Sequence, residues 1–430
     1  MFFEPASCLT GELEPPPDKS ISHRAALLSG MCDGEVLIRN YLSSADTSST
    51  LKALVRLGVQ IRQRNGEVIV RGVGLWGPRE TAFTIDVGNA GTLLRLLPGW
   101  LAGQNRAKWT LDGDESIRRR PVDRIAEPLR RMGAGIECRE GRLPPLTVTG
   151  ATLRGTHYEL PVASAQVKSC VLLAGLLASG TTTVVERHPS RDHTELMLRE
   201  AGVPLNVDRV DGATTITVER MDELHLDEID VPGDFSSAAF FLVAAALVPD
   251  AQVLLRGVGV NPTRTGLLDV MERMGAPVDL RDRRTSGSEE VADIAVGHAT
   301  LRATVVEPGE VPLMIDELPL VALLGAFAEG ETVVRGAEEL RHKESDRIAT
   351  VVDGLRNLGA EIEARSDGFA VQGTGELRGG TIDSAADHRL AMLGAVAGLA
   401  SRDGVEVRGF EAADVSYPGF LNDLRSVTDG

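Results

Sequence analysis

The chain has 430 residues, more than one hydrophobic core of ordinary size needs, and this length favours about two domains. Its hydrophobic content of 43% is that of a soluble globular protein, and its longest uncharged apolar stretch, residues 238–248, is too short to span a membrane. The net charge of −17 argues against a nucleic-acid partner, but it leaves room for a small anionic ligand in a local cationic cleft.

The N-terminal sequence MFFEPASCLT has neither a basic region nor a cleavage-site pattern, so we expect no signal peptide. The four cysteines are far apart and form no CxxC pair, which is typical of proteins in reducing compartments. These features predict a cytoplasmic protein without a membrane partner. For its oligomeric state we expect a monomer.

Six times along the chain, a helix of small apolar residues runs directly into a short β-branched strand. These helices are expected to begin near Lys19, Gly91, Gln166, Phe235, Leu318 and Asp387. A repeat with so long a period indicates one supersecondary unit used several times. Because each helix is apolar almost all round, we expect it to be buried on every side.

A second helix follows in each unit and ends at a glycine before a short strand. The pattern L-x-x-h-G, in which h is an apolar residue and Met replaces Leu in one copy, marks this helix end and the strand after it. It occurs at residues 54–61, 129–136, 198–205, 271–278 and 355–362, whereas the sixth copy, residues 418–427, lacks the glycine. The glycine is predicted to cap the helix in the left-handed conformation, which a Cβ would resist. Each unit is therefore expected to run strand, helix, strand, helix, strands.

Two segments have the composition of linkers, residues 14–17 (EPPP) and 227–233 (DEIDVPG). Three units lie between them and three follow the second. We therefore predict an α/β fold with two domains of three units each: residues 15–232, and residues 1–14 plus 233–430. Residues 281–291 (RDRRTSGSEEV) are expected to form a solvated loop.

The starts of the apolar helices carry polar residues, most of which ordinary N-caps explain. Cations at a helix start are different, because the helix dipole disfavours them unless an anion offsets their charge. Lys19, Lys168 and Arg389 occupy such positions, and Arg24 lies one turn inside the first helix. These four residues indicate a bound anion.

Further cations stand in the predicted loops. Arg120 precedes a proline at a fixed extended position and is a functional candidate, whereas its neighbours Arg118 and Arg119 are expected to be solvated. The remaining loop cations are Arg191, Arg341, Lys343 and Arg347. So many cations imply a ligand with more than one phosphate or carboxylate group.

Acid–base candidates lie among these cations: Asp316 and Glu317 at one helix start, Glu344 between Lys343 and Arg347, and His388. No His or Cys pair has the spacing of a metal site, so we expect no metal. We also expect no cofactor, since the phosphate-binding pattern GxxxxGK[ST] does not occur.

At these residues the chain resembles a known family. The phrases PPPDKSISHRAALL, GNAGTLLR, DESIRRRP, SAQVKS, SRDHTE, GDFSSAAFF, HKESDR and DHRLAM, in this order, are similar to those of 5-enolpyruvylshikimate-3-phosphate synthases. The resemblance runs from about Leu13 to Pro418. It implies the enolpyruvyl transferase fold, an inside-out α/β barrel of two domains, each built from three βαβαββ units.

The resemblance also implies the reaction and the roles of residues. The enolpyruvyl group of phosphoenolpyruvate would pass to the 5-hydroxyl of shikimate 3-phosphate, with release of phosphate. The implied ligands of shikimate 3-phosphate are Lys19, Ser20, Arg24, Ser164, Gln166, Arg191, Asp316 and Lys343. Those of phosphoenolpyruvate are Lys19, Gly91, Arg120, Gln166, Arg347 and Arg389, and the substrate-binding set also includes Asn89, Thr92, Ala165 and His388. Asp316 and Glu344 would transfer protons, assisted by Lys19 and His388.

Four positions depart from the best-known enteric members of the family. Ala165 stands where a second serine is usual, His193 where those members have a tyrosine, Glu339 where they have an asparagine, and Val415 where they have a lysine. The phrases SAQVK, NPTR and RDHTE instead resemble the divergent second class of the family. Arg341 and Lys168 are candidates to supply the anion contact that Val415 lacks.

Three other functions fit parts of the pattern. The sister enolpyruvyl transferase acting on UDP-N-acetylglucosamine has the same fold, but its family has a cysteine in the loop at residues 114–118 and asparagine at the position of Ser20. An RNA 3′-phosphate cyclase would need an ATP site and fits the net charge of −17 poorly. A non-catalytic repeat protein that binds a phosphometabolite would have no use for Asp316, Glu344 and His388.

Overall fold

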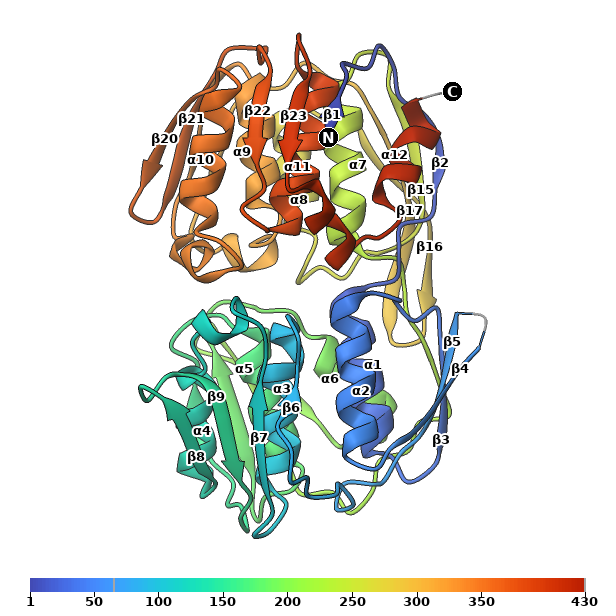
Figure 1. Ribbon diagram of the computed structural model, residues 1–430, viewed down its shortest axis with the longest axis vertical. Coiled ribbons are helices and arrows are strands. Elements are labelled where there is room, and N and C mark those ends of the chain that lie inside the picture. Colours follow the sequence, from blue (N-terminus) through green and yellow to red (C-terminus); the bar gives the residue numbers. More distant parts are fainter. Residues whose placement is uncertain (65, 429–430) are drawn as a thin grey trace. The chain divides into compact units, whose positions relative to one another are not determined.

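The computed structural model describes residues 1–64 and 66–428, so the last two residues of the second predicted domain lie outside the described part. The chain divides into two compact units. Unit 1 comprises residues 1–16, 232–285 and 290–430, and unit 2 comprises residues 17–231 and 286–289. Figure 1 shows the elements of each unit.

The six apolar helices form the centres of the two hydrophobic cores. They are α1 (Lys19–Met31), α3 (Gly91–Ala102) and α5 (Ala165–Gly175) in unit 2, and α7 (Phe235–Leu247), α9 (Leu318–Phe327) and α11 (His388–Ala400) in unit 1. Each begins within one residue of its predicted start. Every residue of α7 and α9 except Phe327 is buried, which confirms that these helices are covered on all sides.

The second helices of the first five units end as predicted. They are α2 (Ala45–Arg56), α4 (Asp123–Met132), α6 (His193–Glu200), α8 (Gly266–Met274) and α10 (Arg347–Asn357). The glycine after each has a positive φ, from +83° at Gly202 to +112° at Gly133. The sixth copy is α12 (Phe420–Thr428).

The strands form six sheets, one for each of the six repeats. In unit 2 the strand orders are β14-β3-β5-β4, β6-β7-β9-β8 and β10-β11-β13-β12. In unit 1 they are β16-β17-β15-β2, β18-β19-β21-β20 and β1-β23-β22. In four of the six sheets the strand before the apolar helix pairs in parallel with the strand after it, and the other ladders of these sheets are antiparallel. The other two sheets exchange this strand: β3, after α1, pairs in parallel with β14 from the end of the third repeat, and β15, after α7, pairs in parallel with β2 from the start of the chain.

The strand bounds in unit 2 are β3 Glu35–Arg39, β4 Gln60–Arg64, β5 Glu67–Arg71, β6 Ile85–Asp86, β7 Lys108–Asp112, β8 Gly135–Arg139, β9 Leu143–Thr149, β10 His157–Glu159, β11 Thr182–Glu186, β12 Asn206–Val210, β13 Ala213–Val218 and β14 Glu228–Asp230. The strands outside this group are β1 Phe2–Phe3, β2 Thr10–Leu13, β15 Gln252–Gly259, β16 Val278–Ser286, β17 Glu289–Gly297, β18 Val305–Val306, β19 Gly330–Val334, β20 Glu361–Arg365, β21 Gly368–Gly373, β22 Gly380–Asp383 and β23 Val405–Arg408.

The predicted solvated loop at residues 281–291 is wrong. These residues form the end of β16, a two-residue turn and the start of β17. The side of the hairpin that carries Arg281–Thr285 is exposed, as expected, but Glu289 is only 2% exposed. Charged residues dominate the segment, and such a composition favours a loop over the two paired strands that the structure shows.

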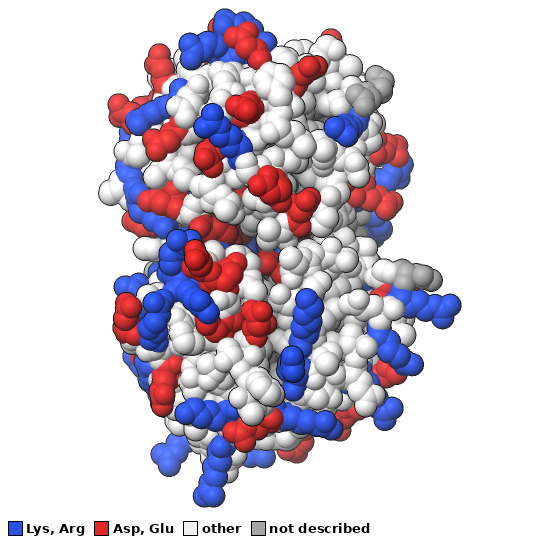
Figure 2. Space-filling view, in the orientation of Figure 1, with Lys and Arg blue, Asp and Glu red and all other residues white. Residues whose placement is uncertain are grey.

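Charges of both signs are spread over the surface. On the face drawn in Figure 2, Lys and Arg lie interspersed with Asp and Glu. Within the described residues, no helix has the length and apolar character that crossing a membrane requires.

Candidate functional site

Lys19 is the first residue of α1, and its ammonium lies 3.0 Å from a carboxylate oxygen of Asp46. Asp46 stands in the first turn of α2, whose start is fixed by the capping box of Ser44 and Thr47. The side chains of Lys19 and Asp46 are 20% and 7% exposed, so the lysine keeps an open side. An internal carboxylate therefore offsets the charge of Lys19 at a position where the sequence alone indicated a bound anion.

Arg24 lies one turn inside α1 and is 3% exposed. Its guanidinium donates to the hydroxyls of Thr194 and Ser169, at 2.7 and 3.1 Å, and to the backbone carbonyl of Ser20 at 3.0 Å. Burial disfavours the charged form and lowers the pKa of Arg24 to about 10. Arg24 is therefore a cation at neutral pH, buried and held by neutral groups, and this arrangement suits the binding of an anion.

A second group of predicted residues meets at the start of α3. Arg120 donates to the side-chain oxygen of Asn89 at 3.2 Å, and its guanidinium lies so close to Gly91 that an added Cβ would be 2.8 Å from Nη1. Gln166, in the first turn of α5, donates to the hydroxyl of Thr92 at 3.2 Å. The structure thus brings five of the predicted residues together.

Arg95 belongs to the same group, although sequence reasoning missed it. It stands one turn after Gly91 on α3 and donates to the side-chain oxygen of Gln166 at 3.1 Å and to the carbonyl of Pro121 at 3.3 Å. Arg95 therefore orients Gln166. The signal that could have found it is an arginine inside an otherwise apolar helix.

The predicted residues at the start of α5 have an ordinary capping role. Ser164 is the N-cap and its hydroxyl accepts from the amide of Val167 at 3.4 Å, and Ala165 is the first helical residue. Arg191 precedes α6, and it lies close enough to Arg24 for its charge to lower the pKa of Arg24 further. Arg118, by contrast, is 53% exposed and paired with Asp112, as its predicted solvated position requires.

Lys168 is fully buried, and its ammonium contacts internal acceptors. It lies 2.7 Å from Glu195 and 3.1 Å from Glu186, and it donates to the carbonyl of Ser190 at 3.1 Å. Burial opposes the charge, but the two glutamates outweigh it and raise the pKa of Lys168. Because three acceptors occupy its three donors, Lys168 does not replace the anion contact that Val415 lacks.

Arg341, the other candidate for that contact, is also occupied. Its guanidinium donates to the carbonyls of Ser366 and Arg365, at 3.1 and 2.7 Å, and to the carboxylate of Asp346 at 2.8 Å. These bonds tie the short helix of residues 338–342 to the turn between β20 and β21. Arg341 therefore has a local structural role.

Asp316, just before α9, lies among three cations. Its Oδ1 is 3.1 Å from Lys343 Nζ and 3.2 Å from Arg347 Nη1, and its Oδ2 is 3.7 Å from Arg389 Nη2. The aspartate side chain is 13% exposed. A carboxylate can accept a proton and the cations can bind anionic groups, so both abilities occur in one place.

Arg347 begins α10 and is 1% exposed. Its Nε and Nη2 donate to the two oxygens of Asp387 at 2.8 and 3.2 Å, and Nη2 also donates to Glu344 at 2.7 Å. Burial opposes the charge, but Asp387 and Glu344 outweigh it and raise the pKa of Arg347. Arg347 in turn lowers the pKa of Asp387 against the effect of burial. Asp387 is also the N-cap of α11, which begins with His388 and Arg389.

Glu317 is completely buried at the N-cap of α9. Its Oε1 accepts from the hydroxyl of Ser236 and lies 3.5 Å from Arg389 Nη1, whereas its Oε2 has no hydrogen-bond partner among the described residues. Arg389 also donates to the carbonyl of Asp316 at 3.3 Å. Glu317 and Asp316 thus hold Arg389 from two sides.

Sequence reasoning found all of these cations except Arg95 but missed most of their internal partners. The missed residues are Arg95 and the carboxylates Asp46, Glu186, Glu195 and Asp387, and Glu317 was named only as an acid–base candidate. All of them except Glu186 lie at a helix start or within its first two turns, which is the signal that a search could have used.

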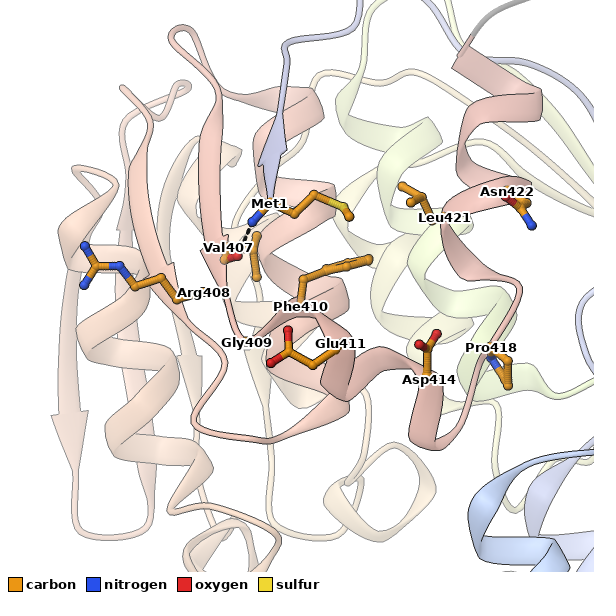
Figure 3. A pocket seen from close by; sticks show the side chains of 10 residues that line it. All are labelled: Met1, Val407, Arg408, Gly409, Phe410, Glu411, Asp414, Pro418, Leu421 and Asn422. Atoms are coloured by element: carbon orange, nitrogen blue, oxygen red, sulfur yellow. Dashed lines mark hydrogen bonds between the residues drawn. The ribbon is translucent and has the colours of Figure 1, made fainter.

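A pocket of about 700 Å³ lies elsewhere in unit 1 (Figure 3). At its wall the terminal amino group of Met1 donates to the carbonyl of Val407 at 2.8 Å. Its lining residues are Met1, Val407, Arg408, Gly409, Phe410, Glu411, Asp414, Pro418, Leu421 and Asn422. None of them is a predicted site residue, so the candidate site is defined by the clusters of charged residues and not by this cavity.

Comparisons with known proteins agree on one family. The family model described as EPSP synthase (3-phosphoshikimate 1-carboxyvinyltransferase) matches residues 3–424. The 3-phosphoshikimate 1-carboxyvinyltransferases of Geobacillus kaustophilus and Roseiflexus castenholzii are 49% and 48% identical to this chain, in each case over 98% of both chains. A solved structure of EPSP synthase from Acinetobacter baumannii, 39% identical, covers 99% of this chain and 97% of its own with a TM-score of 0.86. The predicted α/β enolpyruvyl transferase fold is thereby confirmed, and the chain belongs to the EPSP synthase (3-phosphoshikimate 1-carboxyvinyltransferase) family.

Proposed function

We propose that the charged clusters described above are the substrate-binding and catalytic groups of this enzyme. The activity is that of the family: the chain transfers the enolpyruvyl group of phosphoenolpyruvate to the 5-hydroxyl of shikimate 3-phosphate and releases phosphate, in the shikimate pathway to aromatic amino acids. The observation that carries the residue assignment is the position of Asp316 between Lys343, Arg347 and Arg389.

Both substrates are polyanions, and the family resemblance supplies the proposed ligands of each. Shikimate 3-phosphate is bound by Lys19, Ser20, Arg24, Ser164, Gln166, Arg191, Asp316 and Lys343. Phosphoenolpyruvate is bound by Lys19, Gly91, Arg120, Gln166, Arg347 and Arg389, and Asn89, Thr92, Ala165 and His388 complete the substrate-binding set. The buried, hydroxyl-bound guanidinium of Arg24 and the group around Gly91 support this assignment. No cofactor or metal takes part in the proposal.

The proposed chemistry needs two proton-transfer groups. A proton is added to C3 of phosphoenolpyruvate while the 5-hydroxyl attacks C2 and gives up its proton to Asp316. The resulting tetrahedral ketal then loses a proton from C3 and phosphate from C2, which restores the double bond. Glu344 serves C3, and Lys19 and His388 assist. Arg347 contacts both Asp316 and Glu344, at 3.2 and 2.7 Å, so one guanidinium links the two proposed proton-transfer carboxylates.

Phosphate release tests the activity and its rivals. It is measured after mixing the protein with phosphoenolpyruvate and either shikimate 3-phosphate or UDP-N-acetylglucosamine. Release with the first acceptor alone supports the proposal, and release with the second points to the sister transferase. Binding of shikimate 3-phosphate in a calorimeter without any release points to a non-catalytic binding protein.

Two substitutions test the residue roles. Asp316→Asn and Glu344→Gln keep the size of each side chain but remove its proton-accepting ability, so each should lower kcat by at least about 100-fold. Asp353→Asn, at an exposed position of α10, is the matched control and should keep the wild-type rate. Unchanged kcat in both variants would reject the assignment of the proton-transfer groups.

We also propose that the chain belongs to the divergent second class, a placement that the pairing of Lys168 in SAQVK with Glu195 in RDHTE supports. Residues 15–232 form the shikimate-phosphate domain, and residues 1–14 with 233–430 form the domain that carries Asp316, Glu344 and His388. The enzyme is a cytoplasmic monomer. Light scattering at several concentrations should give the mass of one chain, and cell fractionation tests the location.

A further inference from the structure

The tip of the hairpin formed by β16 and β17 belongs to one compact unit, and most of the two strands belong to the other. Ser286–Glu289 belong to unit 2, whereas the strand residues on both sides of them belong to unit 1. Glu289 is 2% exposed, although Glu290 beside it is exposed. A carboxylate of this kind needs partners, because an unpaired buried charge is costly.

Glu289 contacts the first residue of α6. Its Oε1 lies 2.7 Å from Nδ1 of His193, which is 1% exposed. The other ring nitrogen of His193 is buried without a hydrogen-bond partner among the described residues. Since a carboxylate accepts, the Nδ1–H of His193 donates to Glu289. Ser288 makes a hydrogen bond with the carboxylate of Glu200, so the tip contacts both the first and the last residue of α6.

The next residue of α6 holds Arg24. The hydroxyl of Thr194 accepts from Arg24 Nε at 2.7 Å, and it also lies 2.6 Å from the hydroxyl of Ser169, the second side chain that holds the guanidinium. No carboxylate within hydrogen-bond distance of Arg24 occurs in the described residues. The place of Arg24 therefore depends on these two hydroxyls and on the carbonyl of Ser20, and through Thr194 it depends on where α6 begins.

We propose that Glu289 is a positioning residue for the binding of shikimate 3-phosphate. Its contact with His193 fixes the start of α6, and this fixes Thr194 and hence the guanidinium of Arg24. The inference rests on the proposed function, in which Arg24 is a ligand of that substrate. It also assigns a role to the segment at residues 281–291, whose composition alone indicated a solvated loop.

The test compares Glu289→Ala with Glu289→Gln and with Glu290→Ala, the exposed neighbour, in the full-length protein. Binding of shikimate 3-phosphate is measured by calorimetry, and KM for both substrates and kcat by phosphate release. Glu289→Ala should weaken the binding of shikimate 3-phosphate about tenfold, while KM for phosphoenolpyruvate changes less than about twofold, because a small displacement of one ligand is costly. Glu289→Gln keeps an acceptor oxygen and should recover most of the affinity, and Glu290→Ala should match the wild type.

A double-mutant cycle with Thr194→Val asks whether Glu289 acts through Thr194. The losses of affinity should then be clearly less than additive, because both changes displace the same guanidinium. Additive losses, or an equal effect of Glu289→Ala on both substrates, would overturn the inference. If Glu289→Ala does not fold, the test uses Glu289→Gln and His193→Asn instead. Both variants keep a hydrogen bond between the two positions and should bind shikimate 3-phosphate with normal affinity. A loss of affinity in both variants as large as that of Thr194→Val would count against the inference. Wild-type protein that does not bind shikimate 3-phosphate would instead reject the proposed function.

Discussion

Arg347 and Asp387 form a two-pronged ion pair in which both side chains are almost completely buried, at 1% and 0% exposure. Nε lies 2.8 Å and Nη2 3.2 Å from the two carboxylate oxygens. The same carboxylate caps α11, so one buried group orients both a proposed ligand of phosphoenolpyruvate and the helix start that carries two further proposed site residues, His388 and Arg389. Stability and function are therefore coupled at this pair.

Asp387→Asn should lower the free energy of unfolding by about 3–5 kcal/mol, because removing one partner leaves the guanidinium of Arg347 buried without its main counter-charge. Urea unfolding followed by circular dichroism measures the loss. Asp403→Asn is the matched control, since Arg402 and Asp403 make a similar two-pronged pair at the surface, where both side chains are 58% exposed. The control should be nearly neutral. Equal losses in the two variants would show that burial does not decide the strength of these pairs.

His23 should make stability depend on pH. It is buried in α1 with Nδ1 2.6 Å from the hydroxyl of Thr50, and burial lowers its pKa from 6.5 to about 4. Between these two values the unfolded chain binds a proton that the folded chain does not. Stability from this residue is therefore complete above pH 6.5 and falls as the pH decreases, by up to about 1.4 kcal/mol per pH unit.

Unfolding free energies at pH 7 and pH 5 test this dependence. His23→Asn keeps a polar group near the position of Nδ1 but cannot be protonated, so the difference between the two pH values should shrink by roughly 2 kcal/mol. His225→Asn, at a position whose side chain is 74% exposed, should leave the difference as it is in the wild type. The same pH dependence in His23→Asn would assign the effect to other groups.

The repeat could be predicted from the sequence because its signals are local. The apolar helices and their start positions follow from runs of small residues, and the positive φ of Gly58, Gly133 and the equivalent glycines follows from one residue type after a helical pattern. The cations of the candidate site were also visible, because their positions at helix starts break a local electrostatic rule.

The partners of these cations could not be predicted, because the pairing is set by how distant segments pack. Lys168 meets Glu195, which is 27 residues further along the chain, and Arg24 meets Thr194, which is 170 residues away. Without those contacts, Lys168 was interpreted as a sign of a bound anion, although two internal glutamates neutralise it. Glu289 escaped prediction for a similar reason, because the other charged residues of its segment are exposed.

Gly91→Ala should weaken the binding of phosphoenolpyruvate. The added methyl would lie 2.8 Å from Arg120 Nη1 and 3.1 Å from Arg95 Nη1, and both are flexible ends of side chains, so the fold should persist while the guanidinium of Arg120 moves. We expect KM for phosphoenolpyruvate to rise about tenfold, with KM for shikimate 3-phosphate little changed. Gly34→Ala, where an added Cβ has no neighbour within 4 Å, is the control in steady-state kinetics. A rise of both KM values together would mean that the methyl disturbs more than Arg120.

Lys19→Met should keep the fold but remove at least about 3 kcal/mol of transition-state stabilisation, which is the scale for loss of one preorganised donor. The lysine is 20% exposed, so its replacement costs little packing, and in the proposed site it neutralises charge on both substrates. The value comes from kcat/KM of wild type and variant, together with urea unfolding to check the fold. Lys52→Met, at an exposed position of α2, is the matched control and should retain wild-type kinetics. Near-native turnover of Lys19→Met would instead restrict Lys19 to its ion pair with Asp46, and the assignment of this residue to both substrates would be wrong.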